Sequence, residues 1–207
     1  MTAIVDLRPA RGGDPMVEVV LESGDRVRLH SRRLLEHAVA IGDSITAGEL
    51  AALRRAAAAD AAERRALRLI GRRPRSRAEL GRRLAEWGLA PAEAAAVIDR
   101  LAGMGACDDR VLADAVVWSR RATGHGRLRI EADLARLGMA DDARAEVAAA
   151  TASGEEARAR TALARRFGPA GVPPDPASLR RAAGFLARRG FDADTVACVL
   201  ETLDPDP

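Results

Sequence analysis

The sequence has few aromatic residues and no lysine. Two Trp and three Phe make up its Phe, Trp and Tyr content in 207 residues, so any hydrophobic core has to be built from Ala, Leu and Val. Ala, Leu and Arg are strong helix formers, and the composition therefore favours a mainly α fold. All 33 basic residues are arginines, a bias that a GC-rich genome also produces.

Long apolar runs and a cysteine framework are missing as well. No segment approaches the roughly 18 apolar residues of a membrane-spanning helix, and the N-terminus lacks the apolar stretch of a signal peptide. Cys107 and Cys198 are too few for a disulfide framework. These features predict a cytoplasmic protein with reduced thiols, and we expect both cysteines to be buried as small apolar side chains.

A short pattern of Leu, Gly four residues later, and then a large apolar residue occurs three times. The copies are Leu84–Gly88–Leu89, Leu134–Gly138–Met139 and Leu186–Gly190–Phe191. The glycines lie 50 and 52 residues apart, a period typical of helical repeat proteins. A helix that ends with Gly in the left-handed conformation, followed by an apolar residue folded back on the last turn, explains the pattern.

Helical periodicity follows each copy of the pattern at the same offset. Apolar residues spaced i, i+3, i+4, i+7 follow the first and third copies, and the second copy keeps the spacing only in part. The three sets are Ala94, Val97, Ile98, Leu101; Arg144, Val147, Ala148, Thr151; and Val196, Val199, Leu200, Leu203. The sequence therefore predicts three tandem helical repeats.

Residues 1–50 differ from the repeats. Strand-like runs at 3–7, 16–21 and 26–30 predict a small β region with a hairpin. A short helix capped by Ser31 and a turn over 43–45 follow. A long helix is expected from about Thr46 to Arg73, with a break near Asp60. The predicted division is 1–50 for this β/α region, 51–107 for a linker helix and repeat 1, 108–152 for repeat 2, and 153–207 for repeat 3 with an insertion at 168–176 and a short tail.

Several polar residues occupy positions typical of helix starts. Thr46 with Glu49, and Ser76 with Glu79, have the spacing of capping boxes. Ser178 is expected to begin the helix that follows the insertion. The adjacent Asp108 and Asp109 are interpreted as helix caps and not as an acid and a base, because neighbours on a helix start do not face one site.

The net charge of +3 is unevenly distributed. Residues 61–90 hold nine arginines and three acids, residues 118–137 hold five arginines and two acids, and the stretch between them is net acidic. A surface on which basic regions alternate with an acidic one can steer a charged partner. The alternative is that these arginines form ordinary solvated helix faces.

Two arginine-rich turns are the candidate binding sites, for a protein partner or for DNA phosphate. Their residues are Arg72, Arg73, Arg75, Arg77 and Arg82 near Pro74, and Arg120, Arg121, His125, Arg127 and Arg129 around the Gly124–Gly126 loop. The third repeat has the insertion in place of a matching turn, which favours the first two repeats as the binding part. Glu79 and Asp133 are interpreted as caps or ion-pair partners, and Trp87 and Trp118 as core residues, since stacking on single strands needs several exposed rings.

Two neighbouring segments resemble the RecX regulatory-protein family. The first repeat is similar over Arg72–Leu80, Leu84 and Gly88, and the link into the second over Gly105 and Asp108–Ala113. The second repeat is similar at Arg120–Arg121, Gly124, Gly126, Arg127, Arg129–Ile130, Asp133–Leu134 and Gly138, with Asp133 where the family usually has Glu. The resemblance covers about residues 61–204, and the third repeat is the more divergent part.

The resemblance implies a regulatory role without catalysis. Proteins of this family consist of tandem three-helix repeats in an elongated, curved molecule. They bind RecA recombinase filaments, in the groove or at the ends, and inhibit ATPase, strand-exchange and coprotease activity in recombination, DNA repair and the SOS response. It implies a monomer without cofactor or metal. The arginine clusters alone leave a second hypothesis open, a basic helical protein that binds DNA independently of RecA. An enzyme is not favoured, because the sequence offers no nucleophile–base pair, Gly-rich phosphate loop or metal-ligand cluster.

Overall fold

The computed structural model describes residues 1–9, 15–168 and 171–202. Its contacts divide the chain into two compact units, one of residues 1–74 with 80–107 and one of 75–79 with 108–207. Ten helices and four strands lie in the described ranges, so the predicted mainly α class with a small N-terminal β region is confirmed. The predicted tail and part of the predicted insertion, 169–170, lie outside the described residues, as does the loop 10–14. The finer division at residues 50 and 152 and the elongated, curved arrangement stay predictions.

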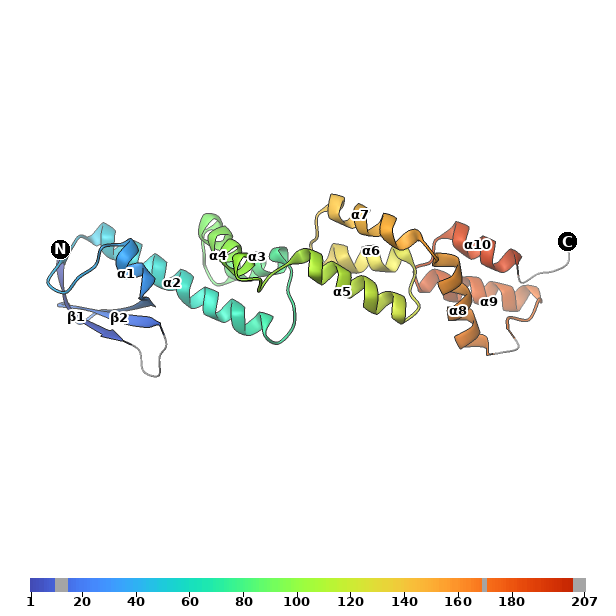
Figure 1. The fold of residues 1–207 in the computed structure, drawn as a ribbon, viewed down its shortest axis with the longest axis horizontal. Coiled ribbons are helices and arrows are strands. Elements are labelled where there is room, and N and C mark those ends of the chain that lie inside the picture. Colours follow the sequence, from blue (N-terminus) through green and yellow to red (C-terminus); the bar gives the residue numbers. More distant parts are fainter. Residues whose placement is uncertain (10–14, 169–170, 203–207) are drawn as a thin grey trace. The chain divides into compact units, whose positions relative to one another are not determined.

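The N-terminal region is an antiparallel sheet packed on a long helix (Figure 1). Its strands are β1 (Thr2–Pro9), β2 (Met16–Leu21), β3 (Arg26–His30) and β4 (Ser44–Ile45), in the order β3-β2-β1-β4. The alternating apolar residues of β1 to β3 meet Leu53 of the helix in one buried cluster. The three predicted strands are confirmed. The turn expected over 43–45 instead contributes β4, because Ser44 and Ile45 pair with the start of β1.

Two helices follow the sheet. α1 (Arg32–Glu36) is one turn long, and Ser31 makes no capping hydrogen bond, so that predicted cap is wrong. α2 (Ala47–Ile70) begins at Thr46 with the predicted capping box, in which the Thr46 hydroxyl accepts from the Glu49 N–H and the Glu49 carboxylate accepts from the Thr46 N–H. The helix is continuous, so the predicted break near Asp60 is wrong as well.

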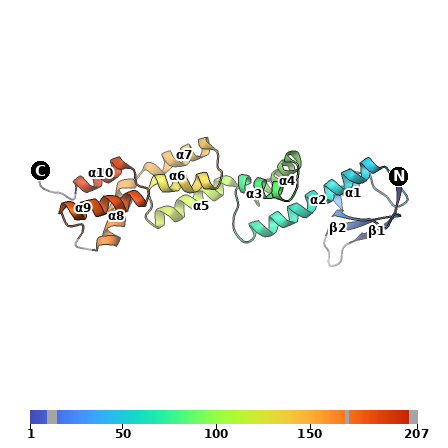
Figure 2. The same ribbon diagram turned by 180° about the vertical axis from the view of Figure 1, so that it is seen from behind.

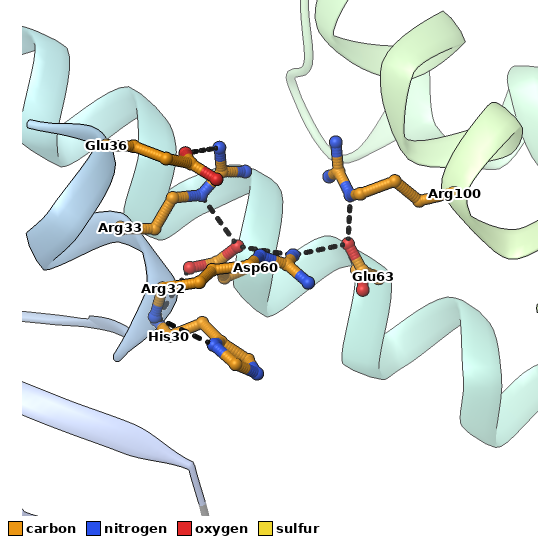
Figure 3. Close-up of polar contacts among 7 residues, drawn as sticks. All are labelled: His30, Arg32, Arg33, Glu36, Asp60, Glu63 and Arg100. Atoms are coloured by element: carbon orange, nitrogen blue, oxygen red, sulfur yellow. Dashed lines mark hydrogen bonds and ion pairs between the residues drawn. The ribbon is translucent and has the colours of Figure 1, made fainter.

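Asp60 lies inside α2 because its carboxylate has tertiary partners (Figure 3). It is buried and accepts hydrogen bonds from the His30 N–H at 2.7 Å and from Arg33 Nε at 3.2 Å. Glu63, one turn further on, accepts from Arg32 at 3.2 Å and from Arg100 at 2.8 Å. We call Asp60 and Glu63 with these partners the α2 acidic cluster. It ties the N-terminal region to the first repeat through buried, paired charges.

Three repeats, each built around three helices, follow along the chain. The end of α2, α3 (Arg77–Glu86) and α4 (Pro91–Gly103) surround the first core, which contains Leu80, Leu84, Val97 and Leu101. The second unit contains α5 (Asp109–Ala122), α6 (Arg127–Arg136) and α7 (Asp141–Ala152). The third contains α8 (Glu155–Phe167), α9 (Pro176–Arg188) and α10 (Ala193–Glu201) (Figure 2). α9 begins earlier than expected, because Asp175 caps it while Ser178 is buried in its first turn.

The second repeat has the smallest apolar core among the described residues. Its buried cluster consists of Ala113, Ile130, Leu134 and Met139, and α7 adds no fully buried apolar side chain among its described residues. This agrees with the partly lost periodicity after Gly138. The third unit, whose core includes both Leu186 and Phe191, is packed more completely.

The Leu–Gly–apolar pattern is a helix-ending motif, as predicted. Gly88, Gly138 and Gly190 have φ of 87°, 76° and 81°. In each copy the N–H after the glycine bonds to the leucine carbonyl, and the glycine N–H bonds to the next carbonyl along the chain. The same two hydrogen bonds end α4 at Gly105 and α5 at Gly124, where no large apolar residue follows. The motif therefore marks helix ends in general, and the period of about 50 comes from the second helix of each repeat.

Acidic residues at equivalent places in two repeats accept hydrogen bonds from backbone N–H groups at the start of the second helix of the preceding repeat. The Arg77 N–H, at the start of α3, donates to the Asp109 carboxylate at 2.8 Å, and the Arg127 N–H, at the start of α6, donates to Glu155 at 2.6 Å. Asp109 and Glu155 each begin the first helix of the next repeat. They satisfy N–H groups that a helix start leaves without an intrahelical partner.

Candidate functional site

The first predicted arginine cluster contains residues in different surroundings. Arg72, Arg73 and Arg82 are exposed, whereas Arg75 pairs with Glu79 and is largely covered. The buried Ser76 hydroxyl accepts from the Glu79 N–H and donates to the Leu137 carbonyl, so the predicted Ser76 cap is confirmed. Arg72, Arg73 and Arg82 belong to one of the two compact units, and Arg75 and Arg77 belong to the other. The two sets are therefore described separately and not as a single cluster.

Two arginines of the second predicted cluster converge on Asp133. Arg120 Nε lies 2.6 Å and Arg129 Nε 3.3 Å from the Asp133 carboxylate, and Arg136 adds a third contact at 2.8 Å. Burial opposes ionisation of this carboxyl, but the hydrogen bond and charge of Arg120 and the charge of Arg129 outweigh it, and the pKa of Asp133 is lowered. The ion-pair interpretation of Asp133 is confirmed, and three guanidinium groups leave the group net positive.

Arg127 is committed to internal contacts. Its guanidinium pairs with Glu131 at 2.8 Å and with Asp192 at 3.1 Å, and its N–H donates to Glu155. It therefore connects the second repeat to the third, and its charge is compensated by two carboxylates.

The α5–α6 turn packs directly against the end of α9. The Gly126 N–H donates to the Arg189 carbonyl at 3.0 Å, and the Leu128 N–H donates to the Gly190 carbonyl at 2.9 Å. A Cβ on Gly126 would lie 2.3 Å from the Gly190 oxygen, so only glycine allows this approach. The end of α9 thus caps the start of α6 and brings third-repeat side chains to the predicted loop.

Three arginines of the third repeat lie around this turn with their guanidinium groups on backbone carbonyls. Arg189 donates to the Thr123 carbonyl, Arg165 to the Ala122 carbonyl at 3.3 Å, and Arg158 to the Thr151 and Ser153 carbonyls at 2.7 and 2.8 Å. The exposed Arg121 lies close enough to Arg158 for the two charges to interact. We name Arg121, Arg158, Arg165 and Arg189 the cationic turn. Within the described ranges none of the four pairs with a carboxylate.

The pKa values of Arg158 and His125 reflect their burial first and the charges of their neighbours second. Burial, and then the positive charge of Arg121, lower the pKa of Arg158, and the Glu155 carboxylate partly opposes them. Burial lowers the pKa of His125, and the charges of Arg189, Arg120 and Arg129 lower it further. His125 is therefore neutral near pH 7, with its Nδ1 3.0 Å from the Thr123 hydroxyl. Such a surface favours an anionic partner.

Sequence reasoning missed the third-repeat members of the cationic turn. Arg165–Arg166 follow Arg120–Arg121 by 45 residues, so they occupy comparable places in successive repeats. That spacing does not say that Arg165 contacts the preceding repeat, because the contact depends on how two repeats pack. The prediction that the first two repeats carry more of the binding therefore overlooks the arginines that the third repeat contributes to the cationic turn.

The two tryptophans differ. Trp87 is partly buried against the first core with Arg65 4.2 Å above its ring, consistent with the prediction. Trp118 is 75% exposed on α5, so its assignment to the core is wrong. The α5 face toward the core is filled by Ala113, Val116 and Val117, which leaves Trp118 on the outer side. Cys107 is buried as expected, and Cys198 is only partly buried.

The described part of the chain offers neither a metal-binding cluster nor a membrane span. None of its helices is long and apolar enough to cross a bilayer. No group of three or more His, Cys, Asp or Glu among these residues could hold a metal ion. The arginines around the α5–α6 turn form the candidate functional surface, because three of them are held on backbone carbonyls there.

Comparison with known proteins agrees with the repeat architecture. Residues 62–101 match the family description "RecX, first three-helix domain", and residues 154–200 match "RecX, third three-helix domain". A crystal structure of a regulatory protein RecX aligns with 97% of this chain and 100% of its own at a TM-score of 0.76 and 16% identity. A RecX structure from Lactobacillus salivarius aligns with 71% of this chain and 97% of its own at a TM-score of 0.61 and 18% identity. At these identities the two structures support the fold.

Curated relatives are similar at a level that shows the family. The regulatory protein RecX of Xanthomonas oryzae pv. oryzae (strain MAFF 311018) is 44% identical over 133 residues, 64% of this chain and 82% of the relative. That of Halorhodospira halophila (strain DSM 244 / SL1) is 40% identical over 150 residues, 72% of this chain and 92% of the relative. With its three-helix units and these relatives, the chain belongs to the RecX family of regulatory proteins.

Proposed function

We propose that this protein is a non-enzymatic regulator that binds RecA recombinase filaments and inhibits their ATPase, strand-exchange and coprotease activities. It acts as a cytoplasmic monomer, without cofactor or metal, in homologous recombination, DNA repair and the SOS response. Family membership supports the regulatory role. The cationic turn is the observation that carries the proposed contact with a filament.

The cationic turn suits a large anionic partner for two reasons. The guanidinium groups of Arg158, Arg165 and Arg189 are oriented by hydrogen bonds to neutral carbonyls, so their geometry is fixed while their charge is retained. Arginine also binds carboxylate and phosphate in a bidentate manner. Acidic side chains of the recombinase or phosphates of its DNA would both meet these requirements, and the contact would weaken with salt.

The test is the DNA-dependent ATPase of RecA with substoichiometric amounts of the full chain. We expect inhibition, and weaker inhibition by the double variant Arg121→Gln/Arg165→Gln. The matched control is Arg83→Gln, an exposed arginine of α3 with a local partner, Glu86. If the wild type neither inhibits nor co-sediments with filaments at any ratio, the proposal is wrong.

A second candidate, DNA binding independent of RecA, is favoured by the same uncompensated charge. It predicts tight binding to bare DNA with a steep salt dependence and no effect on RecA beyond competition for DNA. Saturating the assay with DNA separates the two, because competition for DNA then disappears whereas inhibition through the filament persists.

A further inference from the structure

The third repeat contains an arginine-rich pocket that the regulatory role does not explain. It is open, measures about 740 Å³ and lies between α8 and α9. Its main lining side chains are Arg166, Phe167, Arg180, Arg181, Phe185 and Arg188, and no carboxylate is among its described lining residues. The volume falls within the range of small-molecule sites.

The aromatic rings of the pocket are held in place by the repeat core. Phe167 and Phe185 meet edge to face with centroids 6.5 Å apart. Both are only partly buried, and both pack against the buried cluster that includes Leu163 and Leu186. The rings therefore have fixed positions and remain partly exposed at the pocket wall, where a planar ligand can contact them.

The arginines of the pocket keep their charge. Arg166, Arg180, Arg181 and Arg188 are exposed, and no ion pair with a described residue neutralises them. Arg181 donates to the Ser178 hydroxyl, a neutral acceptor. The nearby Asp175 carboxylate caps α9 by accepting from the Ala177 and Ser178 N–H groups, and it also attracts the Arg181 charge. Arg166, Arg180 and Arg188 are therefore the arginines whose charge the described carboxylates leave available.

A glycine inside α9 leaves the wall of the pocket bare. Gly184 lines the pocket, and a Cβ there would lie 3.3 Å from the Arg188 guanidinium. Glycine is a poor residue for a helix interior. At this position it gives room for the arginine and for close approach of a ligand to the backbone.

We propose that this pocket binds a nucleoside phosphate, either as a free nucleotide or as a nucleotide unit of single-stranded nucleic acid. The base stacks on the exposed phenylalanine surface, and the arginines bind the phosphate through paired N–H donors. Simple inorganic anions would use only half of the lining, and an apolar ligand would leave the charges of Arg166, Arg180 and Arg188 without a counterpart.

The pocket adjoins the cationic turn through residues that are in contact with or next to its lining. The Arg189 guanidinium lies 5.1 Å from the Phe185 ring centroid and also donates to the Thr123 carbonyl. Arg165 and Arg166 are neighbours on α8, one at the turn and one at the pocket. A strand of several nucleotides can place one base in the pocket while the adjoining phosphates contact the turn. This binding goes beyond the proposed regulation of RecA and does not require the recombinase.

The experiment measures binding of the full chain to a fluorescein-labelled oligo-dT by anisotropy, without RecA, across a range of NaCl concentrations. Arg180→Gln/Arg188→Gln is expected to weaken binding and to reduce the slope of log K against log[NaCl] by about 1.4, the value for two lost phosphate contacts on a single strand. Phe185→Leu is expected to weaken binding by about 5- to 150-fold with an unchanged slope, the signature of a lost base stack.

Arg160→Gln is the matched control, since Arg160 is an exposed α8 arginine that pairs with Glu156 and lies outside the pocket. It should bind as the wild type does. Thermal unfolding confirms that each variant is folded, and Phe167→Leu replaces Phe185→Leu if the latter is not.

Free dTMP as competitor distinguishes the two sources of ligand. Displacement of the oligonucleotide by dTMP supports a pocket that accepts free nucleotides. Failure of dTMP to compete, with the variant effects intact, supports a pocket that acts within a strand. If the pocket variants bind like the wild type and the control, the proposal is overturned, whatever the outcome of the RecA assay.

Discussion

Arginines occur in two contrasting settings in this protein. In the α2 acidic cluster, Arg32, Arg33 and Arg100 meet the carboxylates of Asp60 and Glu63 (Figure 3). In the cationic turn, the guanidinium groups of Arg158, Arg165 and Arg189 meet backbone carbonyls, and Arg121 is exposed beside them. A carboxylate cancels the arginine charge, whereas a carbonyl only orients it. The first setting is suited to holding elements together, and the second keeps charge available for a partner.

Removing the central carboxylate of the acidic cluster should have the largest effect on stability. Asp60→Ala leaves the His30 N–H and the Arg33 Nε without their acceptor in a covered position, although Arg33 keeps its second partner, Glu36. We expect a loss of about 2–4 kcal/mol from the free energy of unfolding. Urea denaturation followed by circular dichroism measures it.

Asp60→Asn is the matched control, because its amide oxygen still accepts from the His30 N–H while the charge is gone. It should cost less than Asp60→Ala. Hydrogen exchange adds a local check: continued protection of the His30 amide in Asp60→Ala would contradict the role assigned to this carboxylate.

The contact between the second and third repeats should be the next most sensitive. Gly126→Ala places a Cβ 2.3 Å from the Gly190 carbonyl oxygen, so the backbone has to move, and we expect a loss of about 1–3 kcal/mol. Gly103→Ala is the control, since open space surrounds that position at the end of α4. Equal unfolding midpoints for the two variants would show that the repeats do not depend on this close approach.

The contrast between the two settings is tested by replacing one arginine of each setting with glutamine. Arg121→Gln should change stability by less than about 0.5 kcal/mol, because the side chain is exposed and makes no ion pair with a described residue. It should nevertheless weaken RecA inhibition in a salt-dependent manner. Arg32→Gln should do the reverse, lowering the unfolding midpoint with inhibition intact. If both variants lose stability and neither loses inhibition, the division between structural and binding arginines is wrong.

These two settings also show how far the sequence predicts the structure. The Thr46–Glu49 box and the glycine helix ends were predictable because each depends on residues within five positions of one another. The partners of Asp60 lie 27 to 30 residues away, and those of Arg165 and Arg189 lie 43 and 66 residues away. Trp118 was misassigned for a related reason, since its exposure depends on which α5 face meets α6 and not on its apolar character.

The smallest effect, and the most local, concerns His125. Burial and then the charges of Arg189, Arg120 and Arg129 lower its pKa, so the folded state favours the neutral imidazole. Its contribution to stability is therefore present above the ordinary histidine pKa of about 6.5 and is lost as the pH falls through the lowered value.

Arg189→Gln removes one of these charges and should raise the pKa of His125. NMR titration of the imidazole protons measures this pKa, and the sequence has only three histidines to assign. Arg54→Gln, which removes the partner of Asp25 in the N-terminal region, should leave it unchanged. An anion bound at the cationic turn should raise the same pKa in the wild type, because it offsets the arginine charge. A His125 pKa indifferent both to Arg189 and to bound oligonucleotide would mean that the turn's positive charge is already compensated, and the contrast with the acidic cluster would fail.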